Sequence, residues 1–469
     1  MPVAATLALA LGACVAVQVP KLPDAGLPAH WRNAPQLGAK PDLTGWWKHF
    51  HDPELNALVL RALRDSPDVA QARWRLRAAR ASEEAAGSQF KPSVTVNTTE
   101  RSNAANTASF FQAGFDASWE IGLFGRSGAN GHIARAKTGA AQAELQSARV
   151  SLVAEVVREY LELRAAQRNA ALLHDVAAAD AEKVRLLRTG RHLWLTSQRQ
   201  VEQAVSASAM ADAKLSDPDA AIAKSAQALA LLLGQSEPDP AWLKPAALPR
   251  LEHADVAALP ANLLRTRPDI RYAETQVVQA AGELGIATAN LYPSLTIGGG
   301  LTSSSRILGH DHLGNANTII GLAPIISIPL FDWGQVKAQR RARADLLQAA
   351  LAGYRKAVLA GAAQVETSLA DLSAADRRLK HVNAAVTASQ SLVDMSRHYQ
   401  TLGEGDRMDH IDARLALNES QLARVTARLQ YGVAFVALYK ALGGAPLPQH
   451  ADAGAGTPTT SPVTGPAGR

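Results

Sequence analysis

The hydrophobic pattern of this chain is helical over most of its length. In long tracts, apolar residues recur at spacings of three and four, the period of a helix with one buried face. They include Leu145, Ala148, Leu152, Val156, Tyr160 and Leu163 in an early tract, and Val358, Ala362, Val365, Leu369 and Leu372 in a later one. No proline interrupts residues 93–217 or 330–445. The pattern predicts very long helices, and residues 334–399 alone would reach about 100 Å at about 1.5 Å per residue.

The last helical tract has the pattern of a coiled coil. Its apolar residues follow a spacing of about 3.5 that is interrupted only at Asn418. They are Ile411, Leu415, Leu422, Val425, Leu429, Val433 and Val436. Before this tract, the stretch TLGEGDR, residues 401–407, contains two helix-breaking glycines. We therefore expect two long helices that fold back on each other there as a hairpin.

Two pairs of short segments have strand character instead. Residues 94–99 and 110–119 form the first pair, and residues 295–301 and 319–330 form the second. All four segments are rich in β-branched and aromatic residues. Polar loops are expected between the members of each pair, at residues 101–108 and 303–317. Four strands with open edges do not make a stable free-standing sheet, so the pattern favours closure with strands of other chains.

The chain repeats itself. Three pairs of residues share an offset of 201 positions: Pro67 with Pro268, Asp68 with Asp269, and Pro92 with Pro293. Further on, GLFGR at residues 122–126 answers PLFDWGQ at residues 329–335, and the offset becomes 209 (334 − 125). In each copy the predicted order is a helix, two strands and a long helical hairpin. The chain is therefore predicted to contain two structural repeats.

Small and cyclic residues mark the predicted turns within each repeat. Pro92 and Pro293 end the first helix, since proline suits a helix start and not its interior. The passage from strand to long helix is marked by Gly125, Arg126, Gly334 and Gln335, which we interpret as structural. Pro218 stands where the second copy has Ala427, so a kink is expected in the first copy alone.

Composition and charge narrow the functional classes. Aromatic residues are only 5%, and 48 basic residues are scattered among 42 acidic ones without a block of like charge, which argues against nucleic-acid binding. No apolar run of about 18 residues follows the N-terminus, so no membrane-spanning helix is expected. The short apolar segment at residues 3–14 instead resembles an export signal. It ends in Leu-Gly-Ala-Cys14, the pattern at which bacterial lipoprotein signals are cut and the cysteine is acylated; an idle thiol remains the alternative.

These features predict a domain organisation. Residues 1–13 are a signal peptide, residues 14–64 a lipidated N-terminal segment with an equatorial region, residues 65–250 the first repeat and residues 251–444 the second. Residues 445–469, rich in Gly, Pro, Ala and Thr, are expected to be a disordered tail.

No catalytic constellation or metal site emerges from the sequence. His310, Asp311 and His312 lie in a predicted polar loop without a second ligand cluster, and we interpret them as solvated. The more informative polar residues are Asp409 and Asp412, which share one helix face at i, i+3 spacing. The first copy has Gln200 and Gln203 at these places, so only the second hairpin carries the acidic pair. A pair of merely solvated carboxylates is the alternative.

Several of these motifs together resemble the TolC-like outer-membrane efflux channels, in their lipoprotein branch of the OprM/NodT type. The resemblance rests on the Cys14 site and on four stretches, and it extends from Cys14 to Gly444. The stretches are RPDIRYAETQVVQAAGELGIATANLYPSLTI (267–297), WEIGLFGR (119–126), IPLFDWGQ (328–335) and YQTLGEGDRMDHIDARLAL (399–417).

The resemblance implies a mainly helical fold with a small β part. Three chains would form a periplasmic α-barrel and a 12-stranded outer-membrane β-barrel, with four strands from each chain. Such a homotrimer acts as the exit channel for an inner-membrane pump, of the resistance-nodulation-division type or another, through a periplasmic adaptor. It needs no cofactor beyond the lipid on Cys14. Asp409 and Asp412 match the aspartates that line the family's constricted periplasmic end, and Arg407 and Tyr399 are candidates for contacts that hold this gate closed.

Two other classes of protein stay open at this point. A structural coiled-coil lipoprotein of the envelope would share the long helices, but it has no need of strand pairs in mid-chain. A periplasmic binding protein or enzyme would require a pocket with converging polar groups, which the helical pattern does not indicate.

Overall fold

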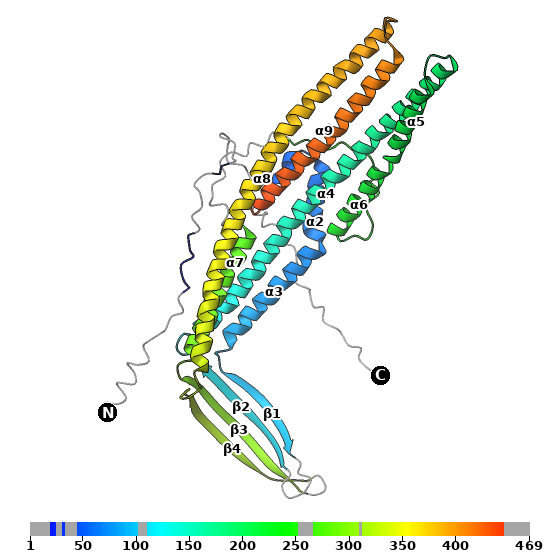
Figure 1. The fold of residues 1–469 in the computed structure, drawn as a ribbon. Coiled ribbons are helices and arrows are strands. Elements are labelled where there is room, and N and C mark those ends of the chain that lie inside the picture. Colours follow the sequence, from blue (N-terminus) through cyan, green and yellow to red (C-terminus); the bar gives the residue numbers. More distant parts are fainter. Residues whose placement is uncertain are drawn as a thin grey trace, which may run out of the picture. The chain divides into compact units, whose positions relative to one another are not determined.

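The computed structural model describes residues 19–24, 31–32, 45–101, 110–251, 266–308 and 312–444. This part of the chain is mainly helical with a small strand part, which confirms the predicted fold class (Figure 1). Its elements are η1 (Trp46–Phe50), α2 (Pro53–Asp65), α3 (Pro67–Ser88), β1 (Ser93–Arg101), β2 (Phe110–Ile121), α4 (Arg126–His192), α5 (Gln198–Ala213), α6 (Ser216–Leu232), α7 (Pro268–Ala289), β3 (Ser294–Leu308), β4 (His312–Ser327), α8 (Gln335–Thr401) and α9 (Arg407–Ala441).

The element boundaries confirm the sequence repeat. Helix α7 begins and ends 201 positions after α3 (268 − 67 and 289 − 88). Helices α4 and α8 each have 67 residues and differ by 209 positions at both ends (335 − 126 and 401 − 192). Even left-handed backbone recurs with this offset: Phe124, Gly125, Trp194 and Gly234 have positive φ, and so do Trp333, Gly334, Gly403 and Gly443.

Two details of the sequence prediction need correction. The predicted loop at residues 303–317 is largely strand, because β3 continues to Leu308 and β4 begins at His312. Its sequence, rich in Ser, Gly, Asn and His, resembled a loop, yet these residues continue to pair with the neighbouring strand across a register shift between Ser305 and Ile307. The predicted strand at residues 319–330 ends at Ser327. The sequence predicts a kink at Pro218, and the structure has two separate helices there: α5 ends at Ala213, and Pro218 lies in the first turn of α6.

The chain divides into two compact units, and each takes segments from both repeats. The first unit holds the sheet, with residues 71–146 and 268–360. Its helices pack through Val277 and Ala281 of α7 against Leu347 of α8. The four strands are antiparallel in the order β1-β2-β3-β4. In the described part of the chain, β1 and β4 pair on one side only and are the edges of the sheet.

The two faces of this sheet differ in character. Because side chains alternate across a strand, the register places one set of residues on each face. One face carries Val94, Val96, Phe115, Trp119, Leu301, Ile320, Leu322 and Ile326. The opposite face carries Thr95, Asn97, Asp116, Ser118, Thr296 and Thr302, with Ile319 and Ile325 at the β4 edge. The apolar face is exposed in the single chain, Leu322 by 78% and Phe115 by 52%.

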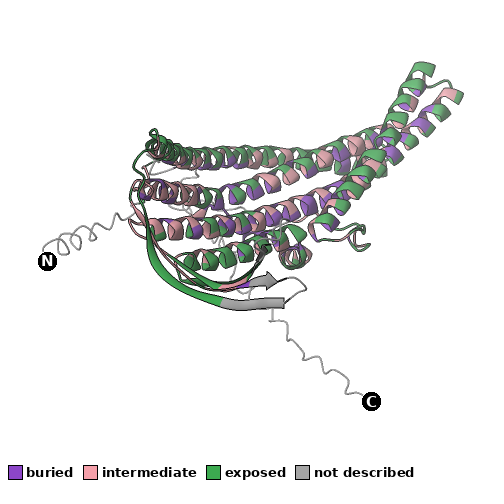
Figure 2. Cartoon of the chain, turned by 90° about the horizontal axis from the view of Figure 1, so that it is seen from below, coloured by how far each residue is buried: buried purple, intermediate pink, exposed green. Residues whose placement is uncertain are grey.

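The second unit contains the helical hairpins. An aromatic cluster lies in its core, where Trp46 stacks on Tyr439 of α9 and Phe50 meets Phe435 edge to face. Nearby, the buried Arg164 guanidinium donates to Glu54 and to the carbonyl oxygens of residues 242 and 244. Figure 2 shows buried residues along the helices, and in this unit residues 361–401 of α8 are mostly exposed.

No helix among the described residues is both long enough and apolar enough to cross a membrane.

Candidate functional site

The candidate gate lies at the second hairpin, in the second unit. Helix α8 ends at Thr401, and α9 begins at Arg407. Asp406 caps α9, since its side chain accepts the amide of Met408 at 3.0 Å. Gly403 takes a left-handed conformation with φ of 76°, and the amide of Gly405 donates to the carbonyl of Tyr399 at 3.1 Å. A side chain at Gly405 would meet the backbone 2.8 Å away, so the turn requires glycine there.

Two of the predicted gate residues contact α4. Arg407 places Nε and Nη2 at 2.9 and 2.6 Å from one carboxylate oxygen of Glu182. Asp412 lies 2.5 Å from the Nζ of Lys183. Arg414 adds a longer contact of 3.6 Å to Glu182. Glu182 and Lys183, which are adjacent on α4, therefore pair with the oppositely charged Arg407 and Asp412 of α9.

The other two predicted gate residues have different surroundings. Asp409 is exposed, and its side chain has no hydrogen bond or ion pair within the described chain. It lies in the first turn of α9, where a carboxylate complements the positive end of the helix. The side chain of Tyr399 is 48% exposed, and its ring contacts His398. The structure thus brings Arg407 and Asp412 to α4 and leaves Asp409 and Tyr399 open to solvent in the single chain.

Charges around this contact shift neighbouring titrations. The hydrogen bond from Arg407 is the main cause that lowers the pKa of Glu182. Burial raises the pKa of Asp180, and the nearby Asp412 adds to this shift, while Lys183 opposes it. Burial also lowers the pKa of His410, and Arg414 and Arg397 lower it further. The Nδ1 of His410 lies 2.8 Å from the hydroxyl of Ser396 on α8. A neutral imidazole therefore links α8 and α9 beside the ion pairs.

Sequence reasoning missed Glu182 and Lys183. Both lie on α4, more than 200 positions before their partners in α9. The repeat relates α4 to α8 and does not say which helix lies beside α9. The available signal was the charge pattern: the neighbours Glu182 and Lys183 are complementary to Arg407 and Asp412.

The first hairpin is built differently at its tip. Gln200, which stands where the second copy has Asp409, belongs to a capping box with Ser197. Trp194 is 85% exposed and has a φ of 63°. This left-handed backbone conformation is energetically unfavourable for a residue with a bulky side chain. The guanidinium of Arg191 lies over its ring, 5.3 Å from the centroid. Leu193 and Leu195 are exposed beside it, so the tip presents three apolar side chains.

The predicted turn residues lie between strand and helix in the first unit. Gly125 and Gly334 have φ of 80° and 83°. Arg126 donates to Glu120 at 2.9 Å and also to Asn290, joining β2 to the end of α7. Gln335 begins α8. Pro92 and Pro293 immediately precede β1 and β3.

The remaining predictions on chemistry fall mostly outside the described residues. Cys14, His310 and Asp311 lie there, and His312 begins β4. Within the described chain, no group of three His, Cys, Asp or Glu residues could hold a metal ion.

The family model "Outer membrane efflux protein" matches residues 58–235 and 259–444 of this chain. The pyoverdine export outer membrane protein OpmQ of Pseudomonas aeruginosa is 30% identical over 462 residues, 93% of this chain and 95% of the relative. The toluene efflux pump outer membrane protein TtgC of Pseudomonas putida is 27% identical and covers 94% of each chain. Among solved structures, the outer-membrane channel OprN is 29% identical with a TM-score of 0.74, covering 90% of this chain and 99% of that one.

Proposed function

The chain belongs to the outer membrane efflux protein family and is an efflux channel of the outer membrane, and we propose that it is the exit duct of a tripartite efflux system. In this proposal three copies form the duct, and a periplasmic adaptor joins it to an inner-membrane pump. The pump supplies the energy, and the duct conducts small molecules passively. The chain itself carries out no reaction and needs no cofactor.

The two-faced sheet is the observation that carries this proposal. A bilayer accepts a sheet only when its edges are paired and its outer face is apolar. One face is apolar from Val94 to Ile326 across all four strands, and the opposite face carries polar residues. The two unpaired edges, β1 and β4, can pair between copies, so three copies would give twelve strands. A coiled-coil lipoprotein without transport activity would have no use for such a sheet.

The long helices suit the periplasmic part of the duct. Helices α4 and α8, with 67 residues each, would measure about 100 Å at about 1.5 Å per residue. The exposed side of α8 offers apolar residues such as Leu346 and Leu392 to other copies. Six hairpins, two from each chain, would close a tube around a threefold axis.

The ion pairs between α4 and α9 support a gate at the end of this tube. Exposed salt bridges contribute about 0–1 kcal/mol each, so the closed form would be held only weakly. Asp409 and Asp412 would recur three times around the axis and form rings of negative charge that attract cations. Arg407 holds α9 against α4 in this arrangement, and Tyr399 lies in the last turn of α8.

A lipid on Cys14 would anchor the N-terminal segment to the membrane. Labelling cells with a fatty-acid analogue tests this directly, since Cys14→Ala should lose the label. Label retained on the Cys14→Ala variant would contradict acylation at this residue.

The cargo is inferred only as a class. Relatives of this chain are named for pyoverdine export and for toluene efflux, which are chemically unlike compounds. We infer that the pump selects the cargo and that the duct accepts small molecules of several kinds.

Accumulation of a fluorescent efflux dye tests the proposal. The protein is expressed beside its genomic neighbours in a Gram-negative strain that lacks its own exit channel, with the neighbours alone as the control. We expect low accumulation that rises when the cells are de-energised. Accumulation equal to the control, despite a trimer in the outer-membrane fraction, would contradict a tripartite system with these partners.

A further inference from the structure

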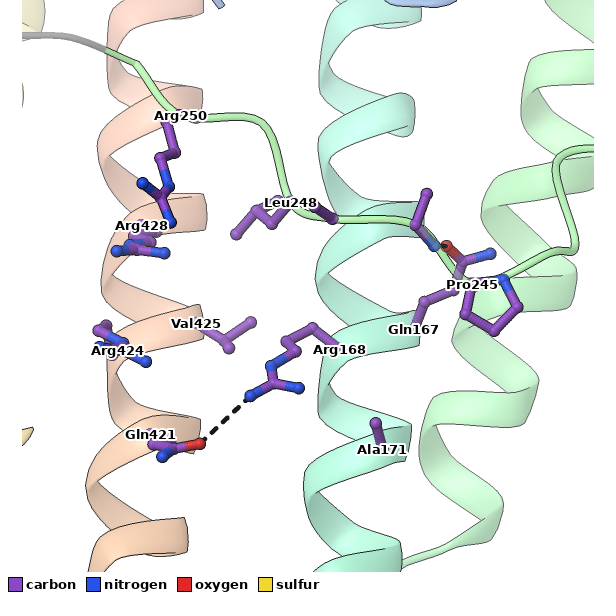
Figure 3. Close-up of a pocket in the computed structure, with 12 residues that line it drawn as sticks. Gln167, Arg168, Ala171, Pro245, Leu248, Arg250, Gln421, Arg424, Val425 and Arg428 are labelled. Atoms are coloured by element: carbon purple, nitrogen blue, oxygen red, sulfur yellow. Dashed lines mark hydrogen bonds between the residues drawn. The ribbon is translucent and has the colours of Figure 1, made fainter. Parts of the chain in front are cut away.

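A pocket in the second unit is lined by four arginines and no acidic residue. It lies between α4, α9 and the segment at residues 245–250, and its volume is about 470 Å³. Arg168 comes from α4, Arg424 and Arg428 come from α9, and Arg250 comes from the segment (Figure 3). This pocket lies on different residues from the candidate gate.

The pocket has a mixed character that suits a bound molecule. Val425 and Leu248 lie between the arginines, and Val425 belongs to a small apolar core with Leu172. Two amides add polar groups: Gln421 accepts from Arg168 at 3.3 Å, and Gln167 accepts from the backbone of Ala246 at 3.3 Å. Pockets of a few hundred Å³ with an apolar floor and a few charged groups are typical small-molecule sites.

The charge of these arginines is not balanced by the described chain. Arg250, Arg424 and Arg428 make no ion pair or hydrogen bond there, and Arg168 contacts only Gln421. Burial lowers the pKa of Arg424 and Arg428, and the neighbouring guanidinium groups lower it further. Arg424 and Arg428 are partly buried, and Arg168 and Arg250 are exposed beside them. Like charges held together in this way repel, so an anion between them would relieve a cost that the folded chain otherwise bears.

We propose that this arginine pocket binds a soluble multivalent oxyanion, a phosphate or carboxylate compound with at least two negative charges. The planar guanidinium fork of arginine matches the paired oxygens of both groups. Four forks from three segments would surround such an anion, and the bound anion would tie the segment at residues 245–250 to α4 and α9. The site goes beyond the exit-duct function and does not depend on it.

Titration calorimetry on the purified full-length protein tests this, with inorganic pyrophosphate and citrate as separate probes. We expect at least one probe to bind saturably, and its affinity to fall as sodium chloride is raised. The two probes distinguish a phosphate site from a carboxylate site. Binding of neither probe by the unmodified protein would overturn the proposal.

The arginines are tested with R424Q/R428Q, which should weaken binding by about tenfold or more. R377Q/R378Q removes the same charge from an exposed part of α8 and is the matched control, so its affinity should stay close to that of the unmodified protein. R424K/R428K keeps the charge and loses the fork, so it should bind with intermediate affinity. Equal binding by R424Q/R428Q and the unmodified protein would overturn the proposal.

The chain's own carboxylates are the competing occupant. Glu252 and Asp255 follow Arg250 closely in sequence and lie outside the described residues. Binding that appears only in E252Q/D255N would assign the arginines to an intrachain partner and overturn the proposal. Binding that is alike in E252Q/D255N and the unmodified protein supports it.

Discussion

Two glycines with left-handed backbone, Gly403 and Gly443, differ in their surroundings. Gly403 has φ of 76° and open space around a would-be side chain. Gly443 has φ of 92°, and a Cβ there would lie 2.9 Å from the Cα and Cγ of Arg267. Arg267 is buried and donates to Gln364 and to the carbonyl of Ala441 at the end of α9. The same substitution should therefore have unequal costs at the two positions.

We predict that Gly403→Ala destabilises the protein by about 1 kcal/mol, the cost of left-handed backbone for an L-residue. Gly443→Ala should cost about 2–4 kcal/mol, because overlap with Arg267 adds about 1–3 kcal/mol. Thermal unfolding followed by circular dichroism measures both. Equal unfolding midpoints for the two variants would show that the contact with Arg267 carries no energetic weight.

His410 predicts a pH dependence at the second hairpin. It faces Ser396 and Arg397 on α8, Arg414 on α9 and Glu182 on α4. Because its pKa in the fold is below the ordinary value of 6.5, an opened hairpin binds a proton that the folded hairpin binds only at lower pH. Protonation therefore favours opening, and the stability of the hairpin should fall as pH decreases below the ordinary histidine pKa of 6.5.

Hydrogen exchange of residues 396–414 at several pH values checks this prediction, after correction for the intrinsic pH dependence of exchange. His410→Gln keeps a polar side chain without a titration in this range, so its protection should be independent of pH there. A decrease of equal size in His410→Gln would assign the effect to another group, such as Glu182, whose pKa is lowered and whose stabilising contact with Arg407 is lost on protonation.

At the scale of elements, the pairing of α4 with α9 is held by few polar contacts. In both pairs, Arg407 with Glu182 and Asp412 with Lys183, the α9 partner is exposed and the α4 partner is partly buried. We predict that E182Q/K183M, which removes both pairs from the α4 side, raises the conductance of the channel in planar bilayers at low salt. High salt should reduce the difference from the unmodified channel, since it screens exposed pairs.

A second pair of opposite charges supplies the control for this measurement. Asp376 and Lys380 form an ion pair of 2.8 Å within α8 alone. D376N/K380M removes one acid and one base, as E182Q/K183M does, and leaves both ion pairs between α4 and α9 in place. Conductance raised equally by both variants would show that loss of charge, and not release of α9, is the cause.

An element could be predicted where residues close to it in sequence determine its structure. The long helices and their breaks were predicted because period, proline and glycine act within a few residues, as at Gly403 and Pro218. The full length of β3 and β4 was missed, because residues such as Ser303 and Thr318 become strand only by pairing with each other. Local sequence does not contain that partner.

The site was predictable only in part for a similar reason. Arg407, Asp409 and Asp412 lie within the first six residues of α9 and could be singled out together. The partners of Arg407 and Asp412 on α4 depend on which helices lie side by side. The same holds for the arginine pocket, whose members lie as far apart in sequence as Arg168 and Arg428. Tertiary packing brings these residues together, and the spacing of residues along the chain does not indicate which helices pack side by side.

At the scale of the whole molecule, one face of the sheet must contact lipid and the other must line the lumen. Ala117 and Ser118 are adjacent residues of the central strand β2, both small and exposed, and they point to opposite faces. Ala117 lies on the apolar face between Val94 and Gly299, and Ser118 lies on the polar face between Ser93 and Gly298. The same large, charged substitution can therefore be placed on either face.

We predict that Ala117→Glu lowers the amount of assembled protein in the outer-membrane fraction, whereas Ser118→Glu leaves it nearly unchanged. A charge on the lipid-facing side of a barrel strand costs up to about 2–4 kcal/mol, while a charge facing the lumen stays in water. Gel electrophoresis of unheated membranes, which preserves assembled barrels, measures the amount. Loss of assembly in Ser118→Glu alone would reverse the assignment: the face that carries Ser118 would then meet lipid, and the face that carries Ala117 would line the water-filled lumen.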